Sequence, residues 1–221
     1  MINALLYRFL TDLSKNNNKE WFQENRKTYN TCRESFIYSV ELMIRGISEF
    51  DKSIAGLQPK NCIFRINRDI RFSNDKRPYK TNFGAFMAPG GRNSGKGGYY
   101  LHIEPGLSMI AGGIYMPSGP VLKTIRNEVY NNLEEFESIV TEEDFVKHFS
   151  GLTGEKLKTK PQGFPDDFEG MEYLRFKHYI VSRNISDKQT QSPEFFNELM
   201  MYFESIYPLN RFLNQAVAEL S

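Results

Sequence analysis

The spacing of hydrophobic residues changes near residue 62, and this change constrains the fold more than any other feature of the sequence. Before residue 62 the apolar residues recur at helical spacing, first over residues 5–13 and then from about residue 20 to residue 50. We expect Asn17 to cap the second helix, with Glu20 completing a capping box. After residue 62 apolar and polar residues alternate, which predicts a strand with one apolar face. Its apolar positions are Cys62, Phe64, Ile66, Ile70 and Phe72.

Further strands and helices follow this first predicted strand. Strands are expected at 99–104 and 107–115, and the turn Pro105-Gly106 between them favours an antiparallel meander. Helical spacing returns after Ser118, with a short helix expected at 142–149 and an irregular stretch at 151–170. A last strand is expected at 178–183. Two helical pieces, separated at Pro208, are expected at the end of the chain.

These elements predict an α+β fold, because helical patterns flank a central group of strands. We expect one domain over residues 1–221, with N-terminal helices at about 3–50, a central sheet at about 60–116 and a C-terminal helical part at about 118–221. The sheet is expected to be antiparallel, with three or more strands flanked by helices from both ends of the chain.

Positive charge is concentrated at the predicted first strand. The whole chain has a net charge of +1, whereas residues 60–80 contain seven basic and two acidic residues, a local net charge of +5. Such a concentration creates a local field that attracts anions, and arginine forks match carboxylate and phosphate oxygens. The candidate ligand-binding residues are Arg65, Arg68, Arg71, Lys76, Tyr79 and Lys80.

Alternation within this segment gives its arginines different expected roles. Arg65 and Arg71 share a face with Asp69, which either bridges them or takes part in a site. Arg68 falls on the apolar face, where an unpaired guanidinium would be costly to bury. We therefore expect Arg68 to pair with a carboxylate, with Glu104 as the nominee, unless a bulge turns it outward.

Candidates for acid–base chemistry lie on the strand expected at 99–104. Tyr100, His102 and Glu104 alternate along it, and a His–Glu pair on one face can position a general base. An ordinary half-exposed strand face has the same pattern. Asp69 is the remaining catalytic candidate. The histidines show no metal-ligand spacing, so neither a metal nor a cofactor is predicted.

The loop containing Gly90, Gly95 and Lys96 matches only part of a nucleotide-binding P-loop. It lacks the serine or threonine after the lysine, and a strand rather than a helix is expected to follow it. We interpret it as a hairpin loop.

The composition favours a cytoplasmic location. Cys32 and Cys62 lie within apolar patterns and lack redox or metal spacing, so both are expected to be reduced. The first ten residues do not resemble a signal peptide, and no apolar run is long enough to span a membrane. No membrane association is expected.

Several motifs distributed along the chain carry a family resemblance: Asn17-Asn18-Lys19-Glu20-Trp21-Phe22, residues 64–72 (FRINRDIRF), residues 75–81 (DKRPYKT), residues 112–117 (GGIYMP), Ile125-Arg126 and residues 160–164 (KPQGF). In these motifs the chain resembles an uncharacterised family of bacteria and fungi, called domain of unknown function 2461, over nearly its whole length. The family is known for no reaction, substrate or cofactor, and the resemblance supports by analogy a site at Arg68, Asp69, Arg71, Tyr79 and Lys80.

The leading functional hypothesis is the binding, with or without chemical processing, of a small ligand that bears a phosphate or carboxylate group. A second hypothesis is a nucleic-acid-binding module in which Tyr79, Phe83 or Tyr99 stacks on bases. The near-zero net charge disfavours this second hypothesis. A third hypothesis is a structural or partner-binding protein whose arginines form only an internal network of ion pairs.

Overall fold

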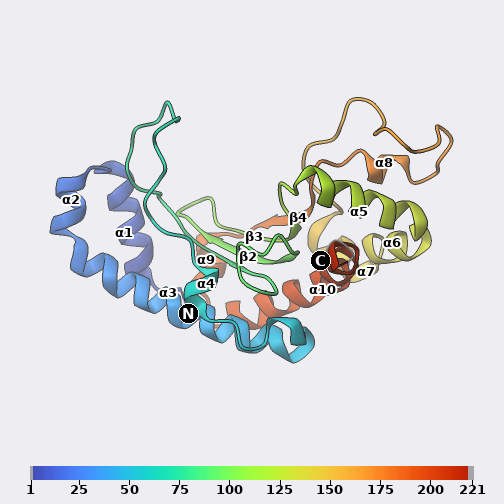
Figure 1. Ribbon diagram of the computed structural model, residues 1–221. Coiled ribbons are helices and arrows are strands. Elements are labelled where there is room, and N and C mark those ends of the chain that lie inside the picture. Colours follow the sequence, from blue (N-terminus) through green and yellow to red (C-terminus); the bar gives the residue numbers. More distant parts are fainter. Residues whose placement is uncertain (1, 219–221) are drawn as a thin grey trace.

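Helices surround a small antiparallel sheet in the computed structural model, which describes residues 2–218 (Figure 1). Helices from both ends of the chain flank the strands, so the fold is α+β, as the sequence predicts. The helices are α1 (Ala4–Lys15), α2 (Lys19–Glu24), α3 (Arg26–Phe50), the 3-10 helix η1 (Lys52–Ile54), α4 (Pro59–Cys62), α5 (Gly119–Asn131), α6 (Leu133–Val140), α7 (Glu143–Phe149), α8 (Met171–Leu174), α9 (Asp187–Thr190) and α10 (Phe195–Ala218). The strands are β1 (Phe83–Met87), β2 (Gly98–Ile103), β3 (Met109–Ile114) and β4 (Tyr179–Asn184).

The strands pair in the order β1-β2-β3-β4, and each neighbouring pair is antiparallel. The meander β2–β3 and the late strand β4 confirm the strands that the sequence predicts at 99–104, 107–115 and 178–183. The β1–β2 connection is a hairpin loop at residues 88–97, as the interpretation of the partial P-loop requires. In register, His102 of β2 lies between Gly84 of β1 and Met109 of β3.

The two faces of the sheet have different surroundings. Tyr99, Leu101 and Ile103 of β2 are fully buried, on the face that packs against α3 and α10. Tyr100 and His102 alternate with them and point to the opposite face. In Figure 1, α3 and α10 run below the sheet, while α1 and α2 lie to one side and α5, α6 and α8 to the other. One face is therefore closed by helices, and the other lies open between two flanking parts of the molecule.

Two adjacent glycines allow β3 to pack closely with its neighbours. A Cβ atom on Gly112 would lie 2.5 Å from Cγ2 of Ile206 in α10. A Cβ atom on Gly113 would lie 2.0 Å from the carbonyl oxygen of Tyr179 in β4, and the φ angle of Gly113 is +104°. Any other residue at these positions would push α10 or β4 away from the sheet.

The N-terminal helices form largely as their spacing predicts. Asn3 caps α1 by accepting a hydrogen bond from the backbone N–H of Leu6 at 2.9 Å. The expected cap at Asn17 is wrong by one residue, because Asn18 accepts the 2.9 Å hydrogen bond from the N–H of Trp21 that starts α2. The side chain of Asn17 is then available for a contact elsewhere in the chain.

Residues 63–82 do not form the regular strand that their alternation predicts. They form an excursion from the sheet, here called the arm (residues 63–82), whose two legs touch at an isolated bridge between Asn67 and Tyr79. The N–H of Arg68 donates to the carbonyl oxygen of Pro78 at 2.9 Å. Proline has no N–H to return, so the ladder cannot continue there.

The apolar residues of the arm do not share one face. Ile66 is buried, Phe64 is at the edge of the open sheet face, and Phe72 is 95% exposed. The first sheet strand begins only at Phe83. Alternation alone therefore led to a wrong assignment, because the residues concerned contact three different surroundings.

The C-terminal helix is also longer than the sequence predicts. Pro208 lies inside the continuous helix α10 and does not divide it. Leu199, Phe203, Ile206 and Leu213 of α10 are fully buried. This apolar packing on both sides of Pro208 offsets the loss of one helical hydrogen bond.

Within residues 2–218, no helix combines the length and the apolar character that crossing a bilayer requires.

The glycine pair in β3 leads to a stability prediction. Gly113→Ala should lower the free energy of unfolding by about 3 kcal/mol or more, because the new methyl group meets a carbonyl oxygen and the φ angle is strained. Gly106→Ala is the matched control, since Gly106 has a φ of +74° but nothing within 4 Å of its would-be Cβ. Its cost should be about 1–2 kcal/mol. Urea unfolding followed by circular dichroism measures both, and equal losses would contradict the close β3–β4 packing.

Candidate functional site

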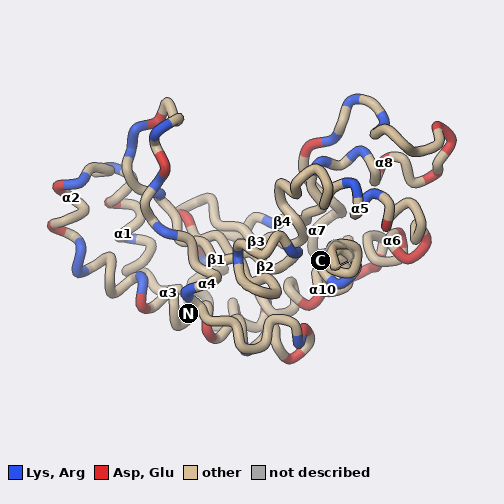
Figure 2. Tube along the Cα trace, in the orientation of Figure 1, with Lys and Arg blue, Asp and Glu red and all other residues tan. Residues whose placement is uncertain are grey.

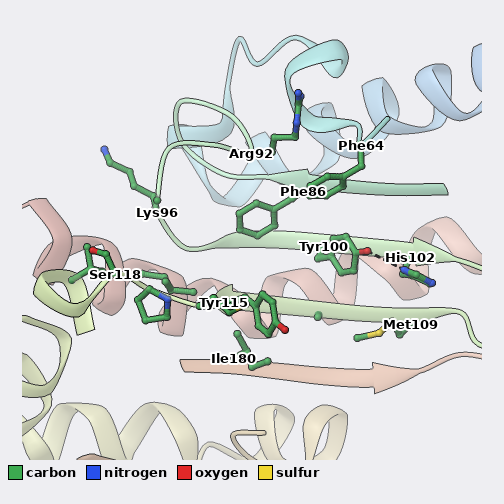
Figure 3. Close-up of a pocket in the computed structure, with 18 of the residues that line it drawn as sticks. Phe64, Phe86, Arg92, Lys96, Tyr100, His102, Met109, Tyr115, Ser118 and Ile180 are labelled. Carbon is green, nitrogen blue, oxygen red and sulfur yellow. Dashed lines mark hydrogen bonds between the residues drawn. The ribbon is translucent and has the colours of Figure 1, made fainter. Parts of the chain in front are cut away.

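A groove of about 790 Å³ lies over the open face of the sheet (Figure 3). Its floor is formed by the outward-facing residues of β2 and β3, and its walls by the arm, the β1–β2 loop and the segment that leads into α5. This volume is within the range of pockets that bind small molecules and cofactors. The open sheet face thus carries a groove large enough for a small ligand.

The lining of the groove is mainly apolar and aromatic. Phe64 of the arm, Phe86 of β1 and Tyr100 of β2 lie along one side, and Tyr115 lies across from them (Figure 3). Phe64 and Tyr100 make an edge-to-face contact with ring centroids 6.1 Å apart. Such rings provide a large apolar surface for a flat ligand.

A chain of hydrogen bonds runs along the floor. The Tyr100 hydroxyl lies 2.9 Å from Nδ1 of His102, and Nε2 of His102 lies 2.9 Å from a carboxylate oxygen of Glu104. The other oxygen of Glu104 accepts a hydrogen bond from the Thr81 hydroxyl at the end of the arm. The alternation that places Tyr100, His102 and Glu104 on one strand face therefore brings them into direct contact. Burial, and secondly the charge of Glu104, raises the pKa of Tyr100 to about 12, so its hydroxyl stays protonated at neutral pH.

The charged residues that line the groove are basic. Lys80 lies on the arm side, and its ammonium is 5.4 Å from the centre of the Phe64 ring. Burial lowers the pKa of Lys80, and the charge of Arg65 lowers it further. Arg92 and Lys96 lie toward the end of the groove away from His102 (Figure 3). None of the residues found to line the groove, within the described part of the chain, is an aspartate or a glutamate.

The arginines farther along the arm pair with acidic residues of the arm itself. Asp75 accepts from Arg68 at 2.6 Å and from Arg77 at 2.7 Å, and Asp69 accepts from Arg71 at 2.7 Å. Figure 2 shows basic and acidic residues close together along the two legs of the arm. Much of the positive charge of this segment is therefore neutralised locally.

The pairing of Arg68 corrects the expectation that Glu104 is its partner. The arm is not a regular strand, so Arg68 does not point into the sheet core, and its side chain remains 25% exposed. Glu104 contacts Thr81 and His102 instead. Arg68 is a half-buried residue that holds the arm together.

Tyr79 attaches the arm to the N-terminal helices. Its ring is buried and stacks on Phe22 of α2 with centroids 4.0 Å apart. The Asn17 side chain donates to the carbonyl oxygen of Tyr79 at 3.0 Å and accepts from its N–H at 3.1 Å. This attachment fixes the position of Lys80, the next residue, at the groove wall.

Tyr79 is thus buried outside the groove, and the other candidate residues divide into two groups. Lys80 and His102 line the groove, with Glu104 hydrogen-bonded to His102, and Arg65 is exposed near Lys80. Arg68, Asp69, Arg71 and Lys76 lie on the arm away from the sheet; Lys76 donates to the carbonyl oxygen of Ile70. Sequence reasoning missed these groove residues: Phe64, Asn82, Phe86, Arg92, Met109 and Tyr115. Alternation along a strand indicates a groove-facing position only for Phe86 and Met109, since the others lie outside regular strands.

A smaller cavity of about 420 Å³ lies between α5 and residues 157–164. It brings together the motifs Ile125-Arg126 and residues 160–164, since Arg126 and Lys160 both line it. Arg126 donates to the carbonyl oxygen of Phe176 at 3.0 Å, and Lys160 pairs with Asp166. Among the described residues, this second cavity shares no lining residue with the groove over the sheet.

The ion pairs of the arm lead to a prediction about its order. Hydrogen bonds from Arg77, and then from Arg68, hold the pKa of Asp75 well below its usual range. Asp75→Asn should therefore loosen the arm, and limited trypsin digestion should cut after Arg71 and Lys76 several times faster than in the wild type. Glu41→Gln is the matched control, because Glu41 pairs with Arg45 on the exposed side of α3.

The pH dependence of the arm follows from the same carboxylate. Because the folded-state pKa of Asp75 is lowered, its carboxylate stabilises the arm fully above the ordinary aspartate pKa of about 4. This stabilisation is lost as the pH falls below that value. Unchanged cleavage in Asp75→Asn would show that the ion pairs do not order the arm.

Comparisons with known proteins identify a family but no activity. Neither the curated proteins nor the solved structures contain a match to this chain. One family model, described as a conserved hypothetical protein (DUF2461), matches residues 6–212. This range includes the arm, the groove over the sheet and both groups of flanking helices. The chain therefore belongs to the DUF2461 family, as the resemblance of its motifs indicates.

Proposed function

We propose that this protein binds a small ligand that has a phosphate or carboxylate group and an apolar, flat body, and that the ligand lies in the groove over the sheet. One observation carries the proposal: the groove has a largely apolar lining, and the charged side chains that line it within residues 2–218 are all cationic. An apolar pocket with a few convergent polar groups is typical of small-molecule sites.

The apolar body of the ligand would lie against Phe64, Phe86 and Tyr115. Its anionic group would be held by Lys80, which has no carboxylate partner within 4 Å among the described residues and whose ammonium is partly desolvated. Coulomb attraction is stronger at such a site than in bulk water. Arg65, which is exposed near Lys80, adds to the positive field.

The hydrogen-bond chain on the groove floor makes chemical processing of the ligand part of the proposal. Tyr100, His102 and Glu104 form a connected set of proton donors and acceptors at the ligand surface. A histidine oriented by a carboxylate is a common arrangement for general acid–base catalysis. Asp69 is not part of this hydrogen-bonded set, because it lies on the arm and pairs with Arg71.

Binding of single-stranded nucleic acid is the second candidate function. The aromatic rings on the open sheet face favour it, since bases stack on such platforms. The stacking residues would be Phe64, Phe86 and Tyr115, because Tyr79, Phe83 and Tyr99 are buried. The ion pairs of Arg68, Arg71 and Arg77 favour a purely structural role for the outer arm, whereas Lys80 lies outside that network.

A cytoplasmic location belongs to the same proposal. Cys32 and Cys62 are buried and form no disulfide, and burial raises the pKa of each thiol to about 11. Unreactive, unpaired thiols are typical of reducing compartments.

Binding of a simple probe tests the proposal. We expect 2-naphthoate to bind in the groove, and its neutral analogue 2-naphthylmethanol to bind at least tenfold more weakly. Lys80→Met should weaken naphthoate binding about tenfold, which is about 1.4 kcal/mol, because it removes the charge but keeps the aliphatic length. Lys147→Met, on the exposed surface of α7, is the matched control. Titration calorimetry measures each affinity; equal binding of the two probes would contradict an anion site.

Oligonucleotide titrations separate the second candidate from the first. A protein that neutralises several phosphates loses affinity steeply as salt rises. We expect generic single-stranded and double-stranded oligonucleotides to bind only at low salt. Sub-micromolar binding at physiological salt, weakened by Tyr115→Ala, would replace the small-ligand proposal with nucleic-acid binding.

A further inference from the structure

The hydrogen-bond chain on the groove floor has a direction that depends on one proton. The Glu104 carboxylate can only accept, and it accepts from both Thr81 and His102. In neutral His102 the single ring proton is therefore on Nε2, and Nδ1 is an acceptor. The Glu104 carboxylate therefore fixes the tautomer of His102.

With neutral His102, the groove presents an acceptor rather than a donor. Nδ1 receives the Tyr100 hydroxyl at 2.9 Å and faces the Asn82 side-chain amide at 3.3 Å. The only hydroxyl proton of Tyr100 is then directed toward the histidine, and its lone pairs are left for the groove. This arrangement repels the oxygen of an anionic ligand.

Protonation of His102 reverses the polarity of the same groups. Both ring nitrogens then donate, Nε2 to Glu104 and Nδ1 to the oxygen of Tyr100. The Tyr100 hydroxyl proton is released to rotate toward the groove. The Asn82 amide, which also lines the groove, no longer has an acceptor in Nδ1 and can donate to a ligand. The floor changes from an acceptor surface to a donor surface.

We propose that Tyr100 and Asn82 form the subsite for a carboxylate or phosphate oxygen of the ligand, and that His102 takes up one proton when the anion binds. This inference rests on the proposed function of the groove and adds the chemistry of recognition: the ligand must offer an oxygen acceptor beside its apolar body. A neutral ligand that only donates hydrogen bonds would be selected when His102 is neutral.

The surroundings of His102 support proton uptake that is coupled to an anion. Glu104 contacts it directly, and Lys80 from the arm lines the same groove. Arg77 is close enough to Glu104 for the two charges to interact. The cross-strand neighbours Gly84 on β1 and Met109 on β3 carry no charge. A bound anion near Lys80 would offset the positive charge there, so that a second positive charge on His102 becomes favourable.

A glycine on β1 allows the Tyr100 hydroxyl to take this position. A Cβ atom on Gly84 would lie 3.0 Å from the Tyr100 hydroxyl oxygen and 3.4 Å from the Phe64 ring. Because Gly84 lacks that atom, the Tyr100 ring and its hydroxyl can lie directly over β1, beside His102. The φ angle of Gly84 is not among the positive ones, so space rather than backbone conformation accounts for the glycine.

Calorimetry with 2-naphthoate, which stays ionised from pH 6 to pH 9, tests the inference on the full chain. Titration at fixed pH in two buffers with different ionisation enthalpies gives the number of protons taken up. We expect uptake toward one proton per ligand and an affinity that falls by up to tenfold per pH unit as the pH rises. Affinity that is equal at pH 6 and pH 9, with no buffer-dependent heat, would overturn the coupling and leave the proposed function intact.

Three variants test whether His102 is the group that takes up the proton. His102→Gln should remove both the proton uptake and the pH dependence, leaving the weak affinity that the wild type has at high pH. Tyr100→Phe should lower the affinity about tenfold at pH 6 and little at pH 9, because only the protonated state uses its hydroxyl as a donor. His148→Gln, on α7 and bonded to Ser205, is the matched control and should behave as the wild type.

The outcomes separate the two proposals. Loss of proton uptake in His148→Gln, or its persistence in His102→Gln, would overturn the assignment to His102. If His102→Gln does not fold, as judged by circular dichroism, Tyr100→Phe decides the assignment through its pH profile. A complete absence of naphthoate binding at every pH would overturn both this inference and the proposed function.

Discussion

The close approach of α10 to β3 at Gly112 is the constraint on which the rest of the structure depends. Because Gly112 has no side chain, Ile206 can pack directly against the strand and close one face of the sheet. Helix α3 covers the same side, so the aromatic and aliphatic core forms there. Within residues 2–218, no second layer of helices covers the other face of the four-stranded sheet, and the flanking parts of the chain leave a groove over it.

The attachment of the arm determines which of its charged side chains line that groove. Stacking of Tyr79 on Phe22 and the paired hydrogen bonds with Asn17 attach the arm to the N-terminal helices. These contacts place Lys80 at the groove wall, while Asp69 and Asp75 neutralise arginines farther out. A segment that is strongly basic in sequence therefore delivers a small number of cations to the site, which suits a small anion better than a long polyanion.

Sequence periodicity predicted the elements whose residues face a single partner layer. The strands β2, β3 and β4 and the helices α1 and α7 have this property, and all were predicted within a few residues, as was the start of α5. The prediction failed for the arm, where Ile66 contacts the core, Phe64 the groove and Phe72 solvent. It also failed at Pro208, because tertiary packing on both sides of the proline outweighs its local preference. Periodicity indicates which residues share a face only when that face meets one environment.

The sequence by itself determined the α+β class, the family membership and the alignment of Tyr100, His102 and Glu104, because a strand repeats every two residues and the three lie at that spacing. Only the tertiary structure decided which sheet face stays open, which carboxylate pairs with Arg68, and that Lys80 and Phe64 join the histidine at one groove. These contacts depend on strand register and on the attachment of residue 79 to residue 17, 62 positions apart in the chain. Local spacing contains no information about such distances, since they are set by the packing of the whole core.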